Sequence, residues 1–514
     1  MKRIVCSIWV MLGAVCFAEE QIAPSSYTSS LWKQYHEAKL NGGEPELADF
    51  SYVGYRHGAE PIPTVEWKVF NVMRAGAKPN DSKSDRKAFL LAIEAAEKHG
   101  SGIIYFPAGR YLLNEQDDPH NEPIVINGSK IVLRGAGCGE GGTELFFDRH
   151  MDPVHPDKLW TCPYIIQFKG EKPAGTKAKV VADARRETFA VEVSDASAFK
   201  AGGWIELSMT DTSPAGVAAA VAPYPVQPAW KTIINRGFVI DELHQVAAVD
   251  GNVITFNEPI HIDVNAVKKW TVQKWAPLEE VGVEDIAFVG NWHEKFVHHK
   301  NAIHDGGWSI VQLSRCVNSW ARNCRFIDVN RVVAVGGSAA VTVEDLSLEG
   351  NRGHNAVSLH GTSHCLIRRI NDTASHWHAG GVAGACSGNV FQHCAYPEDT
   401  CYEAHASQPR WTLFDNVTGG WMYGRWGGAE QNQPNHLHGL VFWNYEKIGL
   451  GEPGAFHFMR SDSKYGRTIM PCVIGFHGVP QAWAEEEIKV LESNGAPVWP
   501  DSLYDAQFEL RMTK

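Results

Sequence analysis

A repeated pattern of apolar and polar positions dominates the second half of the chain. Each unit has an apolar residue, two mostly polar residues and a second apolar residue. The units occupy residues 283–286, 321–324, 343–346, 367–370, 391–394, 414–417 and 442–445. From position 324 onward, the last apolar residues are 22, 24, 24, 23 and 28 residues apart. A repeat of this length is typical of a solenoid whose coils stack on one another. The units are too short for helical repeats, so the pattern predicts a parallel β-helix.

An amphipathic helix precedes the repeats. Ser84 can cap its start and Gly100 its end. Its apolar face consists of Ala88, Phe89, Ala92, Ile93 and Ala96. Residues 102–111 then have the pattern of a strand followed by a turn. Because the first coil of a solenoid exposes unpaired strand edges, we expect this helix to cover that end.

The sequence around this helix resembles that of a known superfamily. Residues 76–85 contain Gly-Ala-x-x-Asn-Asp-x-x-x-Asp, and residues 104–111 read Ile-Tyr-Phe-Pro-Ala-Gly-Arg-Tyr. Both motifs are similar to the N-terminal cap of pectate-lyase-like right-handed parallel β-helix proteins. The likeness is close over residues 70–113, and the repeats support it from 281 to about 460. The resemblance implies an all-β, right-handed parallel β-helix with an N-terminal capping helix.

Two further segments narrow the resemblance. Residues 50–56 and 495–507 resemble a little-characterised group of secreted bacterial β-helix proteins thought to attack polysaccharides. The superfamily includes lyases, hydrolases, epimerases and phage tailspikes, so the resemblance implies a fold and a polysaccharide partner rather than one reaction. Lyases on this fold often use calcium, which makes Ca²⁺ the cofactor that the resemblance implies. The sequence itself shows no clear metal site.

The patterns divide the chain into six parts. One stretch interrupts the repeat and holds strand-like pieces, which predicts an inserted β-rich subdomain, and residues 481–493 have a helical pattern. We expect a signal peptide at 1–18, an N-terminal arm at 19–65, the cap and first coils at 66–170, the insert at 171–275, the main coils with the active groove at 276–480, and a C-terminal cap at 481–514.

The N-terminus has the pattern of a secretory signal. Lys2 and Arg3 precede an apolar run from Ile4 to Phe17, and Ala18 precedes two acidic residues. The run is too short to span a membrane, so we expect a secreted or periplasmic protein without a membrane span. The formal charge of −12 argues against a nucleic-acid partner. We expect the protein to be a monomer.

The cysteines do not indicate a zinc site. Nine of the eleven follow the signal, and none forms a C-x-x-C pair of the kind that structural zinc sites use. Cys324 and Cys394 fall on apolar positions of the repeat. We therefore interpret them as small buried hydrophobic residues rather than as disulfide or metal ligands.

Residues 301–440 hold side chains suited to an anionic ligand. They contain nine Arg and ten His but no Lys, together with eleven Asp and Glu and six Trp. Arg pairs bidentately with carboxylate or sulfate groups, whereas Lys is only a point charge. His accepts or donates a proton near neutral pH. Each of these residues is also compatible with an ordinary solenoid surface. Their positions in the repeat therefore decide which of them are candidates for a site.

Counting along the repeat places several of these residues in one row. The row consists of Gly336, His360, Gly384, His405 and Arg425. Adjacent coils lie about 4.8 Å apart, which puts His405 beside Arg425 and about 10 Å from His360. The two glycines leave room above the sheet or simply ease turns. Glu403 alternates with His405 along one strand, so both face the same side and Glu403 can hold the imidazole in one tautomer.

Aromatic and basic side chains near this row are candidates for binding a sugar. Trp rings stack on sugar rings, although Trp in a solenoid can equally belong to the core. Residues 421–428 bring two Trp, a Tyr and an Arg together. His378 forms a His-x-His pair with His376, which by itself is a weak metal motif. The substrate-binding candidates are Trp377, His378, Trp421, Trp426 and Arg410.

These residues predict a polysaccharide lyase that cleaves an acidic, uronate-containing glycan, with or without sulfate groups, by β-elimination. The reaction needs a cation, a base and an acid within hydrogen-bond reach. Arg425 can neutralise the carboxylate, His405 can act as the base and Tyr423 as the acid. The catalytic candidates are His405, Arg425, His360, Tyr423 and Glu403.

Two alternatives stay open at this point. A glycoside hydrolase would need a pair of carboxylates, for which Asp399, Glu403 and Glu430 are the candidates. A glycan-binding β-helix without catalytic activity would need no proton-transfer group. The sequence does not distinguish among the three and does not name the glycan.

Overall fold

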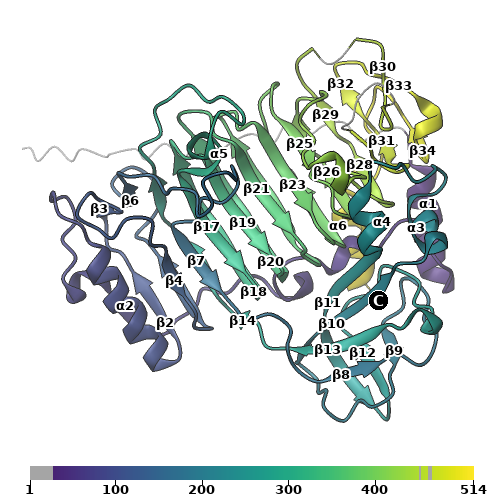
Figure 1. Ribbon diagram of the computed structural model, residues 1–514, viewed down its shortest axis with the longest axis horizontal. Coiled ribbons are helices and arrows are strands. Elements are labelled where there is room, and N and C mark those ends of the chain that lie inside the picture. The colour runs from purple at the N-terminus through teal and green to yellow at the C-terminus, as the bar shows by residue number, and fades with distance from the viewer. Residues whose placement is uncertain (1–26, 451–452, 461–465, 514) are drawn as a thin grey trace, which may run out of the picture.

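The computed structural model describes residues 27–450, 453–460 and 466–513. The predicted signal peptide therefore lies outside the described residues. Figure 1 shows parallel strands stacked coil upon coil along the long axis of the molecule. The capping helix lies at one end, and a separate antiparallel sheet lies beside the coils at the other end.

The largest sheet, which we call the long sheet, has sixteen strands. Its main path runs through β1 (Val69–Asn71), β2 (Gly102–Tyr105), β5 (Ile131–Arg134), β15 (Gly282–Glu284), β18 (Cys316–Ile327), β20 (Ala339–Glu349), β22 (Leu366–Asp372), β24 (Asn389–Gln392), β26 (Thr412–Asp415), β28 (Leu440–Trp443), β31 (Cys472–Ile474) and β34 (Val490–Glu492). The strands paired beside this path are β3 (Gly109–Leu113), β6 (Thr143–Phe147), β14 (Leu278–Glu279) and β16 (Ala287–Val289).

A second sheet of seven strands faces the long sheet across the core. It is formed by β4 (Ile124–Ile126), β7 (Ile166–Lys169), β17 (Ser309–Ser314), β19 (Arg331–Gly336), β21 (Asn355–His360), β23 (His378–Ala383) and β25 (Cys401–Ala404). Shorter sheets continue the coils near the C-terminus. They contain β27 (Thr418–Gly419), β29 (Glu446–Lys447) and β32 (His477–Gly478), and β30 (Ala455–Phe456) with β33 (Ala482–Trp483).

The two large sheets share one apolar core. Val333 and Val357 of the second sheet belong to the same buried cluster as Val343 and Ile367 of the long sheet. Alternate side chains of each strand point inward, so every coil contributes to this core. The prediction of an all-β parallel β-helix is confirmed.

The predicted repeat matches the register of the long sheet. Cys324 pairs with Leu346, and Leu346 pairs with Ile370. The rings of Phe391 and Phe414 stack with centroids 4.9 Å apart, one coil above the other. Cys324 and Cys394 are buried free thiols, as expected. Equivalent residues of the sequence repeat are therefore neighbours along the solenoid.

The third residue of every repeat unit adopts a left-handed backbone conformation. These residues are Asp285, Asn323, Asp345, Arg369, His393, Asn416 and Asn444, with φ between 49° and 61°. Asn and Asp tolerate this conformation better than other non-glycine residues. The polar character of this position thus has a backbone cause, because the chain bends at the same point in each coil.

Helices cover the ends and the outside of the solenoid. The helices are α1 (Ser30–Asn41), α2 (Arg86–His99), α3 (Pro214–Val221), α4 (Lys231–Arg236), α5 (Ala302–Gly306) and α6 (Leu503–Met512), and the 3₁₀ helices are η1 (Phe50–Tyr52), η2 (Tyr55–Gly58), η3 (Val72–Ala75), η4 (Ala266–Lys268), η5 (Glu430–Asn432) and η6 (Glu485–Glu487). The apolar face of α2 is buried against the first coils, and Gly100 ends this helix with φ 87°. The predicted capping helix is confirmed.

An antiparallel sheet of six strands interrupts the coils. It consists of β8 (Lys177–Lys179), β9 (Ala190–Glu192), β10 (Trp204–Asp211), β11 (Phe238–Asp250), β12 (Val253–Phe256) and β13 (Thr271–Trp275). Its inner residues form an apolar cluster of their own. Figure 1 shows it at the side of the C-terminal coils, with α3 and α4 nearby. We call residues 177–275 the insert sheet below.

The N-terminal arm runs back to the C-terminal end. Trp32 and Phe50 are buried in one cluster with Leu413 of β26 and Tyr504 of α6. Thr28 also forms a bridge with Trp499. The arm and α6 thus cover the outer face of the long sheet near its last coils, which the sequence did not predict.

The predicted helix at 481–493 is wrong. This segment forms β33, η6 and β34, and Val490 pairs with Cys472 of β31. Its Ala, Glu and Leu residues favour a helix in isolation, but pairing with the last coil outweighs that preference. Over the described part of the chain, no helix is long and apolar enough to cross a membrane.

Candidate functional site

The site lies on the outward face of the second sheet, where β25 ends. Glu403 of β25 pairs with Gly381 of β23, which pairs with Ser358 of β21. The side chain of Glu403 is almost completely buried. His405 follows two residues later and keeps half of its side chain exposed, so the site reaches the solvent through this ring.

Glu403 is surrounded by an amide and two imidazoles. The amide of Asn355 donates a hydrogen bond to Glu403 Oε2 over 3.2 Å. His378 Nδ1 lies 3.7 Å from Glu403 Oε1, and His405 Nε2 lies 3.8 Å from the same oxygen. Burial raises the pKa of Glu403 to about 8, while the charges of Arg331 and His299 and the bond from Asn355 oppose the rise. The carboxyl group is therefore mostly protonated at neutral pH.

The neighbouring imidazoles are mostly uncharged for the same reason. Burial holds the pKa of His378 well below its ordinary value, and His298 and His405 add to this effect. Half of the His405 side chain is exposed, but partial burial lowers its pKa, and the positive charges of Arg331 and His299 lower it further. An uncharged imidazole can accept a proton, so His405 is an accessible base at neutral pH.

Arg331, at the start of β19, supplies a positive charge on this face. It is one coil from Asn355, because the two residues pair directly, and Asn355 pairs with His378. Its charge acts on both Glu403 and His405. Arg331 also forms a hydrogen bond with the phenol of Tyr164, which is buried.

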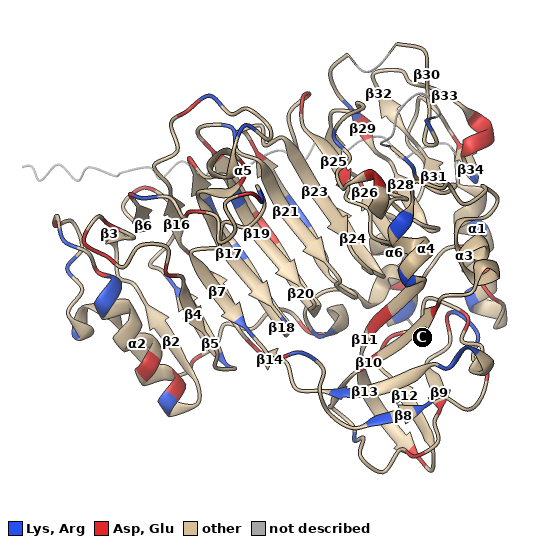
Figure 2. Cartoon of the chain, in the orientation of Figure 1, with Lys and Arg blue, Asp and Glu red and all other residues tan. Residues whose placement is uncertain are grey.

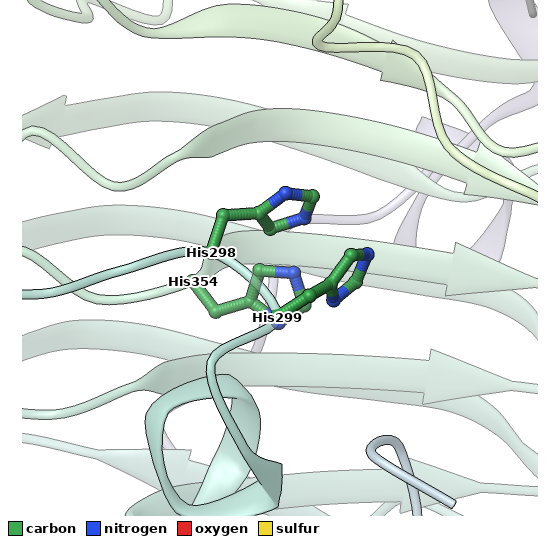
Figure 3. Close-up of side chains that lie close together, drawn as sticks. All are labelled: His298, His299 and His354. Atoms are coloured by element: carbon green, nitrogen blue, oxygen red, sulfur yellow. The ribbon is translucent and has the colours of Figure 1, made fainter.

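A loop between β16 and α5 brings two more histidines over the sheet. His298 stacks on Trp377 with ring centroids 4.9 Å apart, and its ring lies 5.4 Å from that of His378. Burial lowers the pKa of His298 to about 4. His299 and His354 complete this group, as Figure 3 shows.

Trp377 separates this group from a second basic side chain. The guanidinium carbon of Arg425 lies 3.4 Å from the centre of the Trp377 ring, and Arg425 donates a hydrogen bond to the carbonyl of Asp399 over 3.2 Å. The carboxylate of Asp399 pairs with Arg352 and accepts a hydrogen bond from Ser375. The imidazole of His298 and the guanidinium of Arg425 thus cover the Trp377 ring.

The backbone of the segment after Arg425 packs directly on the site. A Cβ atom placed on Gly427 would lie 2.2 Å from Glu403 Oε1 and 2.2 Å from His405 Cδ2. Only a glycine allows this approach, so Gly427 fixes how closely residues 425–428 cover the carboxyl group.

Half of the residues predicted from the sequence come together here. Glu403, His405 and His378 form the centre, with Trp377 and Arg425 beside them. His360 lies on the same face, two coils from His405 and exposed, and both burial and His405 lower its pKa.

The predicted row needs two corrections. His360 pairs with Ala383 rather than Gly384, and Gly384 is a turn residue with φ 66°. Arg425 lies outside any strand, so it reaches the site by a loop and not as the next member of the row. The count failed because the coil containing Arg425 has no strand in the second sheet.

Three predicted substrate-binding residues are elsewhere, and their interpretation was wrong. Trp421 is 1% exposed and packs edge-to-face against Phe442 and other aromatic rings of the last coils. Trp426 is also buried, with its ring parallel to that of Phe458. Arg410 is buried against Glu242 of the insert sheet, with 3.2 Å between Nη2 and Oε1.

Tyr423 faces the C-terminal coils. Its ring stacks on Phe456 with centroids 4.4 Å apart, and its hydroxyl accepts a hydrogen bond from the backbone N–H of His457 over 2.6 Å. The guanidinium carbon of Arg460 lies 4.0 Å from the centre of the same ring. The phenol group predicted from the sequence to be the catalytic acid is thus occupied by contacts with the C-terminal coils.

Several residues of the site were missed by the sequence analysis. They are Tyr164, His298, His299, Asp305, Arg331, His354 and Asn355. The adjacent pair His298-His299 was a usable signal, but it lies just before the stretch in which His and Arg were counted. The others act through contacts between coils, which no local pattern shows.

Charges of both signs are interspersed along the solenoid, as Figure 2 shows. Recognition of an anionic ligand would therefore rest on individual side chains such as Arg331 and Arg425 rather than on one broad basic surface.

Two family models match parts of the chain. Residues 69–142 match "Rhamnogalacturonase A/epimerase, pectate lyase-like", and residues 375–514 match a domain of unknown function, DUF4955. The second match contains Trp377, His378, Glu403, His405 and Arg425.

Short stretches are similar to enzymes of Azotobacter vinelandii. Alginate lyase 7 is 37% identical over 71 residues, which is 14% of this chain and 8% of that protein. Mannuronan C5-epimerase AlgE3 is 34% identical over 105 residues, which is 20% of this chain and 6% of that protein. The chain thus matches only a small part of either relative.

Among solved structures, the tailspike protein gp49 of Pseudomonas phage LKA1 has 11% identity and a TM-score of 0.41, over 79% of this chain and 64% of that one. The exopolygalacturonase of Thermotoga maritima has 12% identity and a TM-score of 0.38, over 87% of this chain and 84% of that one. Neither value bears on the reaction. The N-terminal cap is thus similar in sequence to pectate-lyase-like proteins, and the stacked parallel coils behind it form a parallel β-helix.

Proposed function

We propose that the protein is a lyase that cleaves an acidic, uronate-containing polysaccharide by β-elimination at the Glu403 site. The observation that carries this proposal is the pairing of a buried carboxyl group, whose pKa is raised to about 8, with the half-exposed imidazole of His405, whose pKa is lowered. The short matches to an alginate lyase and to mannuronan epimerases support an acidic polysaccharide as the substrate.

The first requirement of the reaction is to neutralise the substrate carboxylate. The proton on the adjacent ring carbon becomes acidic only when the negative charge that develops on the carboxylate is stabilised. A protonated Glu403 can donate a hydrogen bond to this carboxylate, and Arg331 supplies the positive charge nearby. This assignment replaces Arg425, which is engaged with Trp377 and the carbonyl of Asp399.

The second requirement is a base that can reach the ring proton. His405 takes this proton as the C–H bond breaks, and the electron pair of that bond forms the new carbon–carbon double bond. The glycosidic C–O bond on the next carbon breaks at the same time, and the leaving oxygen takes a proton from the imidazolium of His405. One residue thus serves as base and then as acid, and Tyr423 has no part in the transfer.

Side chains beyond the reacting group can hold more of an acidic chain. His298 stacks on Trp377 and the guanidinium of Arg425 lies over the same ring, so the faces of this tryptophan are not open to a sugar. Arg425 can pair with a further carboxylate along the chain, and the exposed His360 lies on the same face two coils away. We therefore assign Arg425 to substrate binding, with Trp377 holding its guanidinium group in place.

A glycoside hydrolase fits this geometry less well. That chemistry needs a second carboxylate about 5–9.5 Å from the first. Among the described residues, the groups that contact the Glu403 carboxyl are an amide and two imidazoles. The nearby carboxylates of Asp305 and Asp399 are already paired with His299 and Arg352.

The test is an assay on a panel of acidic polysaccharides that includes alginate and pectate. We expect reducing ends and the ultraviolet absorbance of unsaturated uronate to rise together. Reducing ends alone would show hydrolysis. Exchange of ring protons in deuterated water without either signal would show an epimerase, and no change on any substrate would overturn the enzymatic proposal.

Three variants locate the reaction. His405→Ala should lower kcat by about 10²–10⁴-fold, the usual contribution of a general base. His155→Ala, at an exposed position on an N-terminal loop, should leave kcat unchanged. Tyr423→Phe should keep kcat within about two-fold of the original, since the proposal gives this phenol no proton to transfer. Normal activity of folded His405→Ala would refute the assignment.

A further inference from the structure

Three imidazoles converge at the edge of this site. His298 and His299 come from the loop before α5, and His354 comes from the segment before β21. One ring nitrogen of each lies within 4.8 Å of the others. Figure 3 shows the three rings grouped above the strands of the second sheet.

Two of these rings are oriented by partners on their second nitrogen. His299 Nδ1 lies 2.6 Å from the carboxylate of Asp305, and His354 Nδ1 lies 2.9 Å from the backbone carbonyl of the same residue. When the Nδ1–H of each ring donates to its oxygen, the Nε2 atom of that ring keeps a free electron pair. Metal-binding histidines almost always have such an oxygen partner, which fixes their tautomer and direction. Asp305 itself is 1% exposed, so its position is fixed by packing.

The third ring has a buried nitrogen without a partner. His298 Nε2 is shielded from solvent and makes no hydrogen bond. A buried polar atom of this kind costs free energy unless it binds something. Trp377 holds the ring from one side, because the two planes are stacked at 16°.

The backbone of the loop is held in an unusual conformation that directs His299 toward the group. His299 has φ 57°, which is rare for a non-glycine residue. Its backbone N–H donates to Asp305 Oδ1 over 3.0 Å, so the same carboxylate holds both the backbone and the ring. Strained positions that the surroundings enforce in this way occur preferentially at functional sites.

We propose that His298, His299 and His354 form a binding site for a divalent transition metal, with Zn²⁺ as the best match. Zinc accepts three neutral imidazoles in a tetrahedral arrangement whose fourth position is open to water or to an oxygen of a ligand. The nitrogens of such a site lie about 3.4 Å apart, so binding requires the rings to close by up to about 1.4 Å. Calcium takes six to eight oxygen ligands and does not suit this group.

The inference does not depend on the proposed reaction, because it concerns binding by the protein without a polysaccharide. The full chain is treated with a chelator and titrated with Zn²⁺ by calorimetry, with metal content checked after dialysis. We expect one tightly bound zinc per chain. Co²⁺ in its place should give the intense visible absorption of a tetrahedral site.

Matched variants on the same loop separate this site from other histidines. His299→Gln removes a largely exposed ligand and should weaken binding at least tenfold, whereas His293→Gln, also exposed on that loop, should leave it unchanged. Asp305→Asn should weaken binding by about 10–100-fold through the orientation of His299. Circular dichroism verifies the fold of each variant. Absence of tight zinc binding, or equal binding by the His299 and His293 variants, would overturn the proposal.

Discussion

Two regions of the molecule are rich in histidine, and they differ in how the rings are paired. The Glu403 site holds His378 and His405 around one protonated carboxyl group, and one ring is open to solvent. The contact between the insert sheet and the coils holds His244 between two carboxylates. There, His244 lies 3.0 Å from Glu258 and 3.3 Å from Glu242, and all three side chains are completely buried.

The buried contact is a network of opposite charges. Glu242 also pairs with Arg410 and accepts a hydrogen bond from Ser387 over 2.9 Å, so the insert sheet is tied to the turns of two coils. Burial alone would lower the pKa of His244, but the hydrogen bonds and charges of Glu242 and Glu258 raise it to about 9. The ring is therefore charged and serves to hold two parts of the fold together.

His244 also belongs to a group of potential metal ligands, with Glu258 and His364. Both of its nitrogens are already bound to carboxylates, so none is free for a metal. The comparison teaches that a cluster of histidines indicates chemistry when its rings keep a free nitrogen and at least one of them reaches the solvent. A paired and sealed cluster indicates a structural contact.

The same substitution in the two regions should give opposite results. Glu403→Gln should lower kcat by up to about 10²–10³-fold, the contribution of one donor to a developing negative charge, because an amide N–H donates a weaker hydrogen bond than a carboxyl O–H. It should not destabilise the fold. An acid whose pKa is raised on folding weakens the folded state increasingly as pH rises from 4.5 to about 8, and Gln removes this cost. Activity assays and urea unfolding at pH 8 measure both effects; a marked loss of stability would contradict the comparison.

Glu242→Gln should instead act on stability. Removing one partner from a buried charged network leaves Arg410 without its counterion and His244 with Glu258 alone, which costs about 3–5 kcal/mol of unfolding free energy. The measurement is urea unfolding at pH 7, and kcat per folded molecule should stay unchanged. A stable variant with reduced kcat would mean that the contact belongs to the active site.

The pH dependence of stability should sharpen the distinction further. The raised pKa of His244 contributes stability that is fully present below pH 6.5, its ordinary pKa, and is lost as pH rises through about 9. His57, His261, His364 and Arg410 face the same network. The unfolding midpoint in urea should therefore fall between these pH values, and His244→Gln should flatten the change. An equally steep fall in the variant would assign the effect to another group.

Much of the fold followed from the sequence because a solenoid repeats itself. The apolar residues at 324, 346 and 370 recur because each occupies the same place in its coil. The path of the N-terminal arm did not follow, since Trp32 and Phe50 find their partners at the opposite end of the chain. Local patterns contain no record of such contacts.

Part of the site could also be predicted from a local pattern. Glu403 and His405 share one strand end, so alternation alone puts them together. Arg410 was misassigned because its partner, Glu242, lies 168 residues earlier on the insert sheet. Trp421 was misassigned because a tryptophan carries the same signal in a core as in a binding surface.

The left-handed residue in every repeat has a consequence for how such proteins can change. Each coil bends at this column, from Asp285 to Asn444, which gives the coils a common reference on the long-sheet side of the molecule. Segments on the other side, such as the loop that holds His298, can lengthen or shorten without altering the spacing. Insertions in the loops over the second sheet should therefore leave the stacking of the coils intact, so one frame can carry loops of different length and different specificity.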